Sequence, residues 1–180
     1  MQWKPFIFGG EVYDLNHLHP RTCLYEQPAK GDKPARVYTV DIIFSLHCFT
    51  RGILNDEVVD TALFYTDDRE MRVFDFHRYE FSKQLPTIIE SLGQRKCFHT
   101  GHDNFVSVAL IDQNGNSIEY DIFFTASRAS RKRGVLNLYI QSAYVRDEEH
   151  GNRPRLKSPI GFYVILFNVL NDRPIKPAPK

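Results

Sequence analysis

Apolar and polar residues alternate with a period of two along much of this chain. The alternation is clearest over residues 36–49, where every second side chain from Tyr38 to Cys48 is apolar and those between are mostly more polar. Successive side chains of an extended strand point to opposite faces, so this period predicts a strand with one face on the core. His47 is then expected on the wetter face and Cys48 on the apolar face.

Similar short segments follow one another and are separated by turn residues. We predict further strands over residues 3–8, 11–15, 22–26, 61–66, 71–76, 96–100, 104–112, 117–126, 135–145 and 160–170. The pair Asn114-Gly115 lies between two of these segments. It is typical of a two-residue hairpin, because the favoured turn needs positive φ angles at both central positions.

One segment repeats with helical spacing instead. Apolar residues recur at positions 81, 85, 88, 89 and 92, and Gly93 follows as a stop signal. Pro86 lies inside this pattern and removes a backbone donor. Either the helix kinks there, or it begins near Leu85 with Pro86 in its first turn.

These elements predict an α+β protein that is rich in β-strands. We expect a curved, mostly antiparallel sheet with one main helix, about residues 79–92, packed on it. The length of 180 residues suits a single globular domain, which we place at residues 1–171. Residues 172–180 hold three prolines and little to bury, so we expect a loose tail there.

Cysteine usage and hydropathy indicate the compartment. The three cysteines, at positions 23, 48 and 97, show no paired spacing, which argues against a disulfide framework and for a reducing, cytoplasmic location. No apolar run approaches the roughly 18 residues that a membrane span needs, and the N-terminus lacks a secretory pattern. We therefore expect no membrane partner.

Charge is unevenly distributed, although the net charge is only +1. Residues 1–90 carry 10 Lys/Arg and 14 Asp/Glu, while residues 91–180 carry 13 and 8. Basic residues are concentrated in two predicted loops in the second half of the chain. The residues of these loops that we expect to bind nucleic acid are Arg131, Lys132, Arg133, Arg153 and Arg155. Guanidinium groups bind phosphates and tyrosine rings stack on bases, so these loops favour RNA as a partner.

The histidines offer two kinds of chemistry. His17 and His19 would point the same way on an extended backbone, a geometry that zinc or iron can use. Cys97, His99 and His102 form a second cluster, but neither cluster has the spacing of a zinc finger. The alternative is that these side chains bond locally or serve as acids and bases. We expect no cofactor and no metal, with a His-rich metal-binding protein as a further alternative.

A family resemblance is carried by residues Leu136 to Tyr144, a late strand that follows a basic hairpin and ends in Ser-Ala-Tyr. Over the last third of the chain, this segment resembles the terminal sheet of the barnase, EndoU, colicin and RelE-like ribonuclease superfamily. The resemblance implies a helix on a curved antiparallel sheet and RNA cleavage without metal, with the ribose 2′-hydroxyl as nucleophile. It also implies an acid–base residue, a cation at the phosphorane and a late-strand hydroxyl.

Together these features predict a metal-independent endoribonuclease of toxin type. We expect His99 and His102 to act as acid and base, and Arg128 to stabilise the phosphate. The late-strand hydroxyls would come from Ser142 and Tyr144. His47 and Arg51, at the end of the long strand, are further catalytic candidates.

Two alternatives remain open at this point. The same basic loops could bind nucleic acid without cleaving it, in a salt-sensitive manner. The chain could instead be a protein-interaction or dimerisation domain, in which the predicted strand 160–170 forms an exposed edge that pairs with another chain.

Overall fold

The computed structural model describes residues 2–100, 104–113, 116–146 and 159–175. The strands are β1 (Phe6–Phe8), β2 (Glu11–Tyr13), β3 (Arg21–Gln27), β4 (Arg36–Phe44), β5 (Thr50–Arg51), β6 (Phe64–Thr66), β7 (Met71–Phe74), β8 (Lys96–His99), β9 (Phe105–Gln113), β10 (Asn116–Arg128), β11 (Val135–Val145) and β12 (Pro159–Gly161). The α-helices are α1 (Phe76–Ser82), α2 (Leu85–Glu90) and α3 (Phe162–Leu170). Short 3-10 helices are η1 (Asn16–Leu18), η2 (Leu46–Cys48), η3 (Thr61–Leu63) and η4 (Leu92–Gln94).

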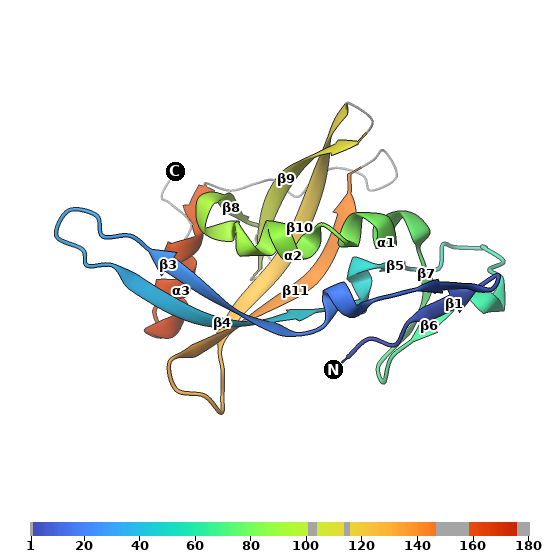
Figure 1. The fold of residues 1–180 in the computed structure, drawn as a ribbon, viewed down its shortest axis with the longest axis horizontal. Helices are drawn as coiled ribbons and strands as arrows, with labels where there is room; N and C mark the ends of the chain where they lie inside the picture. Colours follow the sequence, from blue (N-terminus) through green and yellow to red (C-terminus); the bar gives the residue numbers. More distant parts are fainter. Residues whose placement is uncertain (1, 101–103, 114–115, 147–158, 176–180) are drawn as a thin grey trace.

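Seven strands form a curved sheet in the order β12-β8-β9-β10-β11-β4-β3 (Figure 1). Every neighbouring pair is antiparallel except β11 and β4, which run parallel. Two small sheets, β1-β2 and β5-β7-β6, lie together on the right of Figure 1. The predicted α+β, β-rich architecture with a mostly antiparallel sheet is confirmed.

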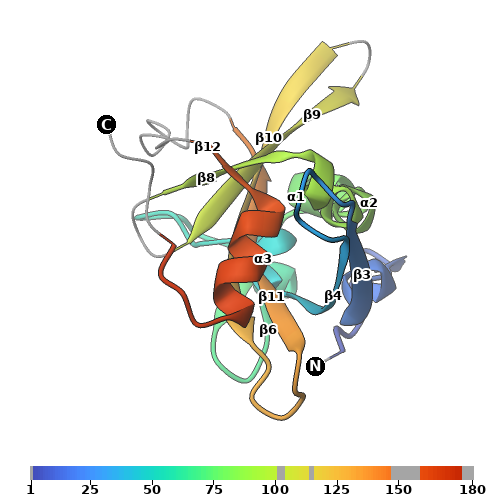
Figure 2. The ribbon, with the colours of Figure 1, turned by 90° about the vertical axis from the view of Figure 1, so that its left-hand side faces the viewer.

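One face of the large sheet carries all three α-helices. Tyr120, Ile122 and Phe124 alternate onto this face of β10 and are fully buried. Phe81 of α1 packs on Tyr120, and Phe162 of α3 packs on Phe124. Figure 2 shows α3 lying across β11, with α1 and α2 beside it. The core therefore fills the space between the curved sheet and the helices, where burial of aromatic side chains stabilises the fold.

The alternation predicted for residues 36–49 holds through the strand that the structure contains. Every second side chain from Tyr38 to Phe44 is buried, and β4 ends there. Leu46 and Cys48 are also buried, but they belong to the 3-10 helix η2. The predicted strand is thus too long by one short turn, and that turn carries His47.

The predicted main helix is divided in two. The helix α1 ends at Ser82, and α2 begins at Leu85 with Pro86 in its first turn. A proline in the first turn loses no helical hydrogen bond, because the N–H at that position has no intrahelical acceptor. The second of the two sequence alternatives is therefore confirmed.

The prediction of a strand over residues 160–170 is wrong. Only Pro159–Gly161 is extended, and residues 162–170 form α3. Phe162, Ile165 and Leu166 are its buried residues, at the i, i+3, i+4 spacing of a helix. A run of apolar residues satisfies both periods, so hydropathy alone could not decide between them. This segment consequently offers no long edge strand to a partner.

The described part of the predicted tail contacts the domain. Asp172 forms an ion pair with Arg128 at 3.1 Å, and the guanidinium of Arg173 lies over the ring of Phe167. Ile175 is half-buried against the core. Residues 176–180 lie outside the described residues.

Within the described part of the chain, no helix is long and apolar enough to cross a lipid bilayer. Cys23, Cys48 and Cys97 are free thiols, and the last two are buried.

His17 joins the N-terminal segment to α1. Its Nε2 lies 2.8 Å from Ser82 Oγ, and that hydroxyl donates to the carbonyl of Tyr79 at 2.7 Å. The hydroxyl proton is therefore used, so His17 Nε2 carries the proton that it donates to Ser82. Burial lowers the pKa of His17 below its ordinary value of 6.5, although the charge of Asp14 opposes this.

The depressed pKa of His17 predicts a loss of stability in acid. The unfolded chain takes up this proton as the pH falls through about 6.5, whereas the folded protein takes it up only at lower pH. The stabilisation is complete above pH 6.5 and is lost as the pH falls through the folded pKa. As the pH is lowered from 7.5 to 5, the melting temperature of His17→Gln should fall less steeply than that of the wild type. The exposed His77 serves as control: equal slopes in His17→Gln, His77→Gln and the wild type would contradict the prediction.

Candidate functional site

Arg128 lies far from the late-strand hydroxyls. It pairs in register with Leu136, near the start of β11, whereas Tyr144 lies eight residues further along that strand. At a rise of about 3.3 Å per residue, the two positions are about 26 Å apart. Arg128 pairs instead with Asp172. The predicted combination of Arg128 with Ser142 and Tyr144 is therefore not assembled.

His99 is also separated from β11. It lies on β8, and β9 and β10 come between the two strands, so its backbone is about 14 Å from β11. Its ring packs on Phe105 with 4.6 Å between centroids. Its Nε2 is buried without a hydrogen-bond partner among the described residues. His102 lies outside the described residues.

The basic hairpin turn between β10 and β11 is exposed. Arg131, Lys132 and Arg133 lie in it, and Lys132 Nζ forms an ion pair with Asp41 at 2.7 Å. This turn is at the opposite end of β11 from Tyr144. Arg153 and Arg155 lie outside the described residues.

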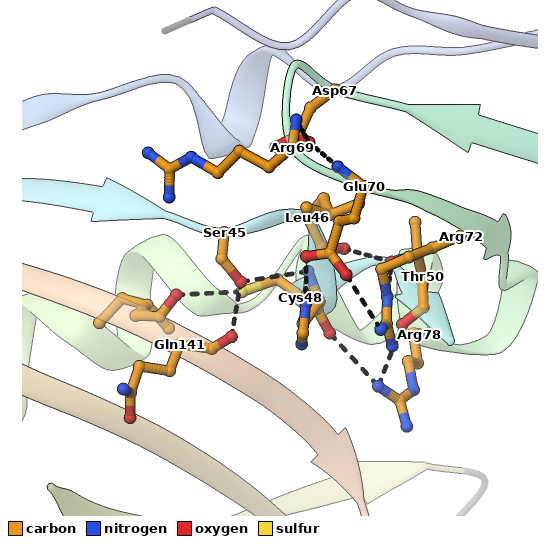
Figure 3. Close-up of polar contacts among 12 residues, drawn as sticks. Ser45, Leu46, Cys48, Thr50, Asp67, Arg69, Glu70, Arg72, Arg78 and Gln141 are labelled. Carbon is orange, nitrogen blue, oxygen red and sulfur yellow. Dashed lines mark hydrogen bonds and ion pairs between the residues drawn. The ribbon is translucent and has the colours of Figure 1, made fainter. Parts of the chain in front are cut away.

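Two of the predicted residues, His47 and Tyr144, both contact Arg78, His47 through its backbone carbonyl and Tyr144 through its ring. Together with Glu70, Arg72 and Arg78 they form what we call the His47 cluster. The cluster lies where η2 leaves the sheet, beside β7 and the start of α1. Figure 3 shows three of its members, Glu70, Arg72 and Arg78.

A β-bulge positions the turn that carries His47. The register between β10 and β11 shifts at Gln141, which is the extra residue. Ser45 Oγ donates to the carbonyl of Gln141 at 2.5 Å and accepts the backbone N–H of His47 at 3.1 Å. Ser45 therefore caps η2 and ties it to β11, as Figure 3 shows.

The imidazole of His47 faces a carboxylate. His47 Nε2 lies 2.6 Å from Glu70 Oε1, and the two side chains are 36% and 39% exposed. A carboxylate only accepts, so neutral His47 carries its proton on Nε2 and leaves Nδ1 as a base. Glu70 is held by a turn in which Asp67 Oδ1 accepts the N–H groups of Arg69 and Glu70.

Two arginines lie beside this pair. Arg72 Nη1 is 3.5 Å from Glu70 Oε2, and its Nε donates to Thr50 Oγ1 at 3.0 Å. Arg78 Nη1 donates to the carbonyls of Thr50 and His47 at 3.1 and 3.3 Å. Burial lowers the pKa of Arg78, and the nearby charge of Arg72 acts in the same direction while Asp75 opposes it.

Tyr144 completes the cluster on the β11 side. The guanidinium of Arg78 lies 5.1 Å from the centre of the Tyr144 ring, a cation–π arrangement. The same ring stacks on Phe123 at 5.6 Å. Burial raises the pKa of Tyr144, so its hydroxyl stays protonated at neutral pH.

The other predicted residues take separate positions. Arg51 lies opposite Val73 in the small sheet and forms a close ion pair with Glu57 that holds the following loop. Thr50 and Arg72 share the other face, so Arg51 points away from the His47 cluster. Ser142 is half-buried on β11, two residues from Tyr144.

Sequence reasoning missed three members of the cluster, namely Glu70, Arg72 and Arg78. One signal was available, because Arg72 interrupts the otherwise apolar strand Met71–Phe74. No local sequence pattern links these residues to His47 or to Tyr144. Tyr144 lies more than 60 residues beyond Arg78 in the chain.

The histidines near the N-terminus are used in hydrogen bonds. His17 contacts Ser82, and His19 Nε2 lies 3.1 Å from the carbonyl of Trp3. In the described ranges, no group of three His, Cys, Asp or Glu side chains is arranged to hold a metal ion. The His47 cluster instead combines an acid–base group, an orienting carboxylate and two guanidiniums, a set suited to proton transfer beside an anion.

Comparison with known proteins identifies relatives along nearly the whole chain. The sequence pattern that defines the YjaZ family matches residues 5–170. The protein named YjaZ from Escherichia coli strain K12 is 29% identical over 177 residues, which cover 96% of this chain and 93% of that protein. No solved structure gives a significant match.

Proposed function

This chain belongs to the YjaZ family, and we propose that it acts on RNA as a metal-independent endoribonuclease whose active site is the His47 cluster. The observation that carries the proposal is the contact between His47 and Glu70 beside Arg72, Arg78 and Tyr144. The ribonuclease resemblance implies the same three roles: an acid–base residue, a cation and a late-strand hydroxyl.

The proposed reaction begins with proton transfer to His47. Nδ1 of His47 takes the proton of the ribose 2′-hydroxyl, and the 2′-oxygen attacks the adjacent phosphorus. The bond from phosphorus to the 5′-oxygen breaks, and that oxygen takes a proton from the Tyr144 hydroxyl. Water then carries the proton from His47 to the Tyr144 phenolate, so both residues return to their starting state. The products are a 2′,3′-cyclic phosphate and a free 5′-hydroxyl.

Glu70 and the arginines support this chemistry. Glu70 holds the His47 ring in one tautomer and stabilises the imidazolium that forms. The guanidiniums of Arg72 and Arg78 are fixed by Thr50 and by two backbone carbonyls, so little reorganisation is needed when negative charge develops on the phosphorane. The free thiols agree with a reducing compartment such as the cytoplasm.

A second candidate function is RNA binding without cleavage. The exposed Arg131 and Arg133 favour it, because neither forms an ion pair with a described residue, and a basic hairpin tip could contact phosphates. This function predicts salt-sensitive binding with intact RNA.

The proposed cleavage can be tested directly. Purified protein with EDTA is expected to cut a single-stranded oligoribonucleotide into fragments that end in a 2′,3′-cyclic phosphate, detected by mass spectrometry. The matched oligonucleotide with 2′-deoxyribose at every position should stay intact, because it lacks the nucleophile. Intact RNA under all conditions, with binding retained, would overturn the cleavage proposal and leave the binding function.

A further inference from the structure

A groove is lined by residues of the β3–β4 hairpin and of α3. Figure 1 shows that this hairpin lies at the opposite end of β4 from η2, which carries His47. The groove has a volume of about 310 Å³, and its wall includes Lys33, Arg36, Tyr163 and Phe167. The smallest ligand pockets in proteins have volumes of about 300 Å³, so the groove is large enough for a small molecule or for one unit of a polymer.

Two guanidiniums gather on one aromatic ring beside this groove. The Cζ of Arg36 lies 4.6 Å from the centre of the Phe167 ring, and that of Arg173 lies 5.4 Å from it. Arginine stacks through its flat face and keeps its N–H edge available for a phosphate. Arg36 comes from the start of β4 and Arg173 from beyond α3, so the fold brings these two charges together.

The charges of this groove lack carboxylate partners. Arg36 and Lys33 in its wall and Arg173 beside it form no ion pair with any described residue, and no Asp or Glu lines the groove. Many other described arginines do have such partners: Arg21, Arg51, Arg72, Arg78, Arg128 and Arg146. Uncompensated cations in a groove attract an anion.

The aromatic wall is held in place before any ligand binds. The Tyr163 hydroxyl donates to the carbonyl of Glu26 at 2.7 Å, which joins α3 to β3. Tyr163 also packs tightly on Gly93, where an added Cβ would lie 2.5 Å from the tyrosine oxygen. A fixed ring loses little conformational freedom when a planar group stacks on it.

We propose that this groove is a nucleotide-binding site. The base would stack against Tyr163 and Phe167, and the phosphate would bind Arg36, Arg173 and Lys33. The ligand is either a free nucleotide or one unit of a single-stranded RNA, since both present the same base and phosphate. The site is separate from the His47 cluster, and the inference stands whether or not the protein cleaves RNA.

The test is a calorimetric titration of the full chain with 5′-AMP, inorganic phosphate and an eight-residue oligoadenylate. We expect 5′-AMP to bind, and the double variant Arg36→Gln/Arg173→Gln to weaken it at least tenfold. Phe167→Ala should weaken 5′-AMP more than inorganic phosphate, because only the nucleotide has a base to stack. Arg69→Gln removes the same kind of charge from the β6–β7 turn and should leave binding unchanged.

The two possible sources of the nucleotide give different results. Oligoadenylate that binds more tightly than 5′-AMP, with the gain lost in the double variant, indicates an RNA strand. Equal affinities indicate a free nucleotide. Undetectable binding of 5′-AMP and oligoadenylate, or binding that the double variant leaves unchanged, would overturn the site.

The proposed nucleotide site in the groove and the proposed active site can be tested independently of each other. Arg36 and Arg173 have no contact with the His47 cluster, so the double variant should still cleave a dinucleotide at the wild-type rate if the cleavage proposal is right. Loss of cleavage in His47→Gln with unchanged 5′-AMP binding supports both sites. Loss of 5′-AMP binding in His47→Gln, but not in the double variant, would place the nucleotide at the His47 cluster and overturn the groove.

Discussion

Replacing His47 with glutamine is expected to lower the rate of RNA cleavage by about 100- to 10,000-fold, the usual contribution of a general acid–base residue. The fold should persist, because Ser45 and Arg78 contact the backbone of His47 rather than its ring. The measurement is the initial rate of oligoribonucleotide cleavage in EDTA, together with the melting temperature of each variant.

Matched variants separate catalysis from structure. Glu70→Gln keeps the shape of the side chain but removes the charge that stabilises the imidazolium, so we expect kcat to fall with little change in KM. His77→Gln, at an exposed site on α1, should cleave at the wild-type rate. Cleavage by His47→Gln at more than a tenth of the wild-type rate would remove His47 from the mechanism.

Replacing Arg146 with methionine is expected to destabilise the fold by about 3–5 kcal/mol. Arg146 Nε and Nη2 both donate to Asp121 Oδ2, at 2.8 and 2.7 Å, and the Asp121 side chain is 0% exposed. Methionine keeps the packing of the aliphatic stem but leaves a buried carboxylate without its main cationic partner. For a chain of this length, the loss corresponds to a decrease in melting temperature of roughly 6–20 °C.

A double variant distinguishes the ion pair from simple packing. In Asp121→Leu/Arg146→Met both charges are gone, so no buried charge is left without a partner, and we expect much of the lost stability to return. Thermal and urea unfolding of the two single variants and the double variant give the coupling free energy. If the effects of the two substitutions simply add, the ion pair does not explain the destabilisation.

Local patterns predicted much of the fold. The alternation from Tyr38 to Phe44 identified a strand and its buried face, because side-chain direction in a strand depends only on position parity. The Asn-Gly signal identified the hairpin between β9 and β10, which pair from Gln113 and Asn116 onward. Pro86 limited the predicted helix to two alternatives, a kink or a start near Leu85, and the structure contains the second.

Other features depended on what each segment packs against. The apolar run at residues 162–170 is a helix because Phe162, Ile165 and Leu166 fit against the sheet, and nothing in the run itself excludes a strand. Residues 46–48 left β4 because the bulge at Gln141 and the Ser45 cap turn the chain there. Both outcomes depend on partners distant in the sequence.

The sequence by itself determined the class of the fold, the position of most strands and the residue types available for chemistry. Only the tertiary structure decided which of those residues meet. The parallel pairing of β11 with β4 and the contact of η2 with α1 brought the His47 carbonyl and the Tyr144 ring to Arg78, while they left His99 and Arg128 elsewhere. Such contacts join segments that are far apart along the chain, so periodicity, which records only local geometry, carries no information about them.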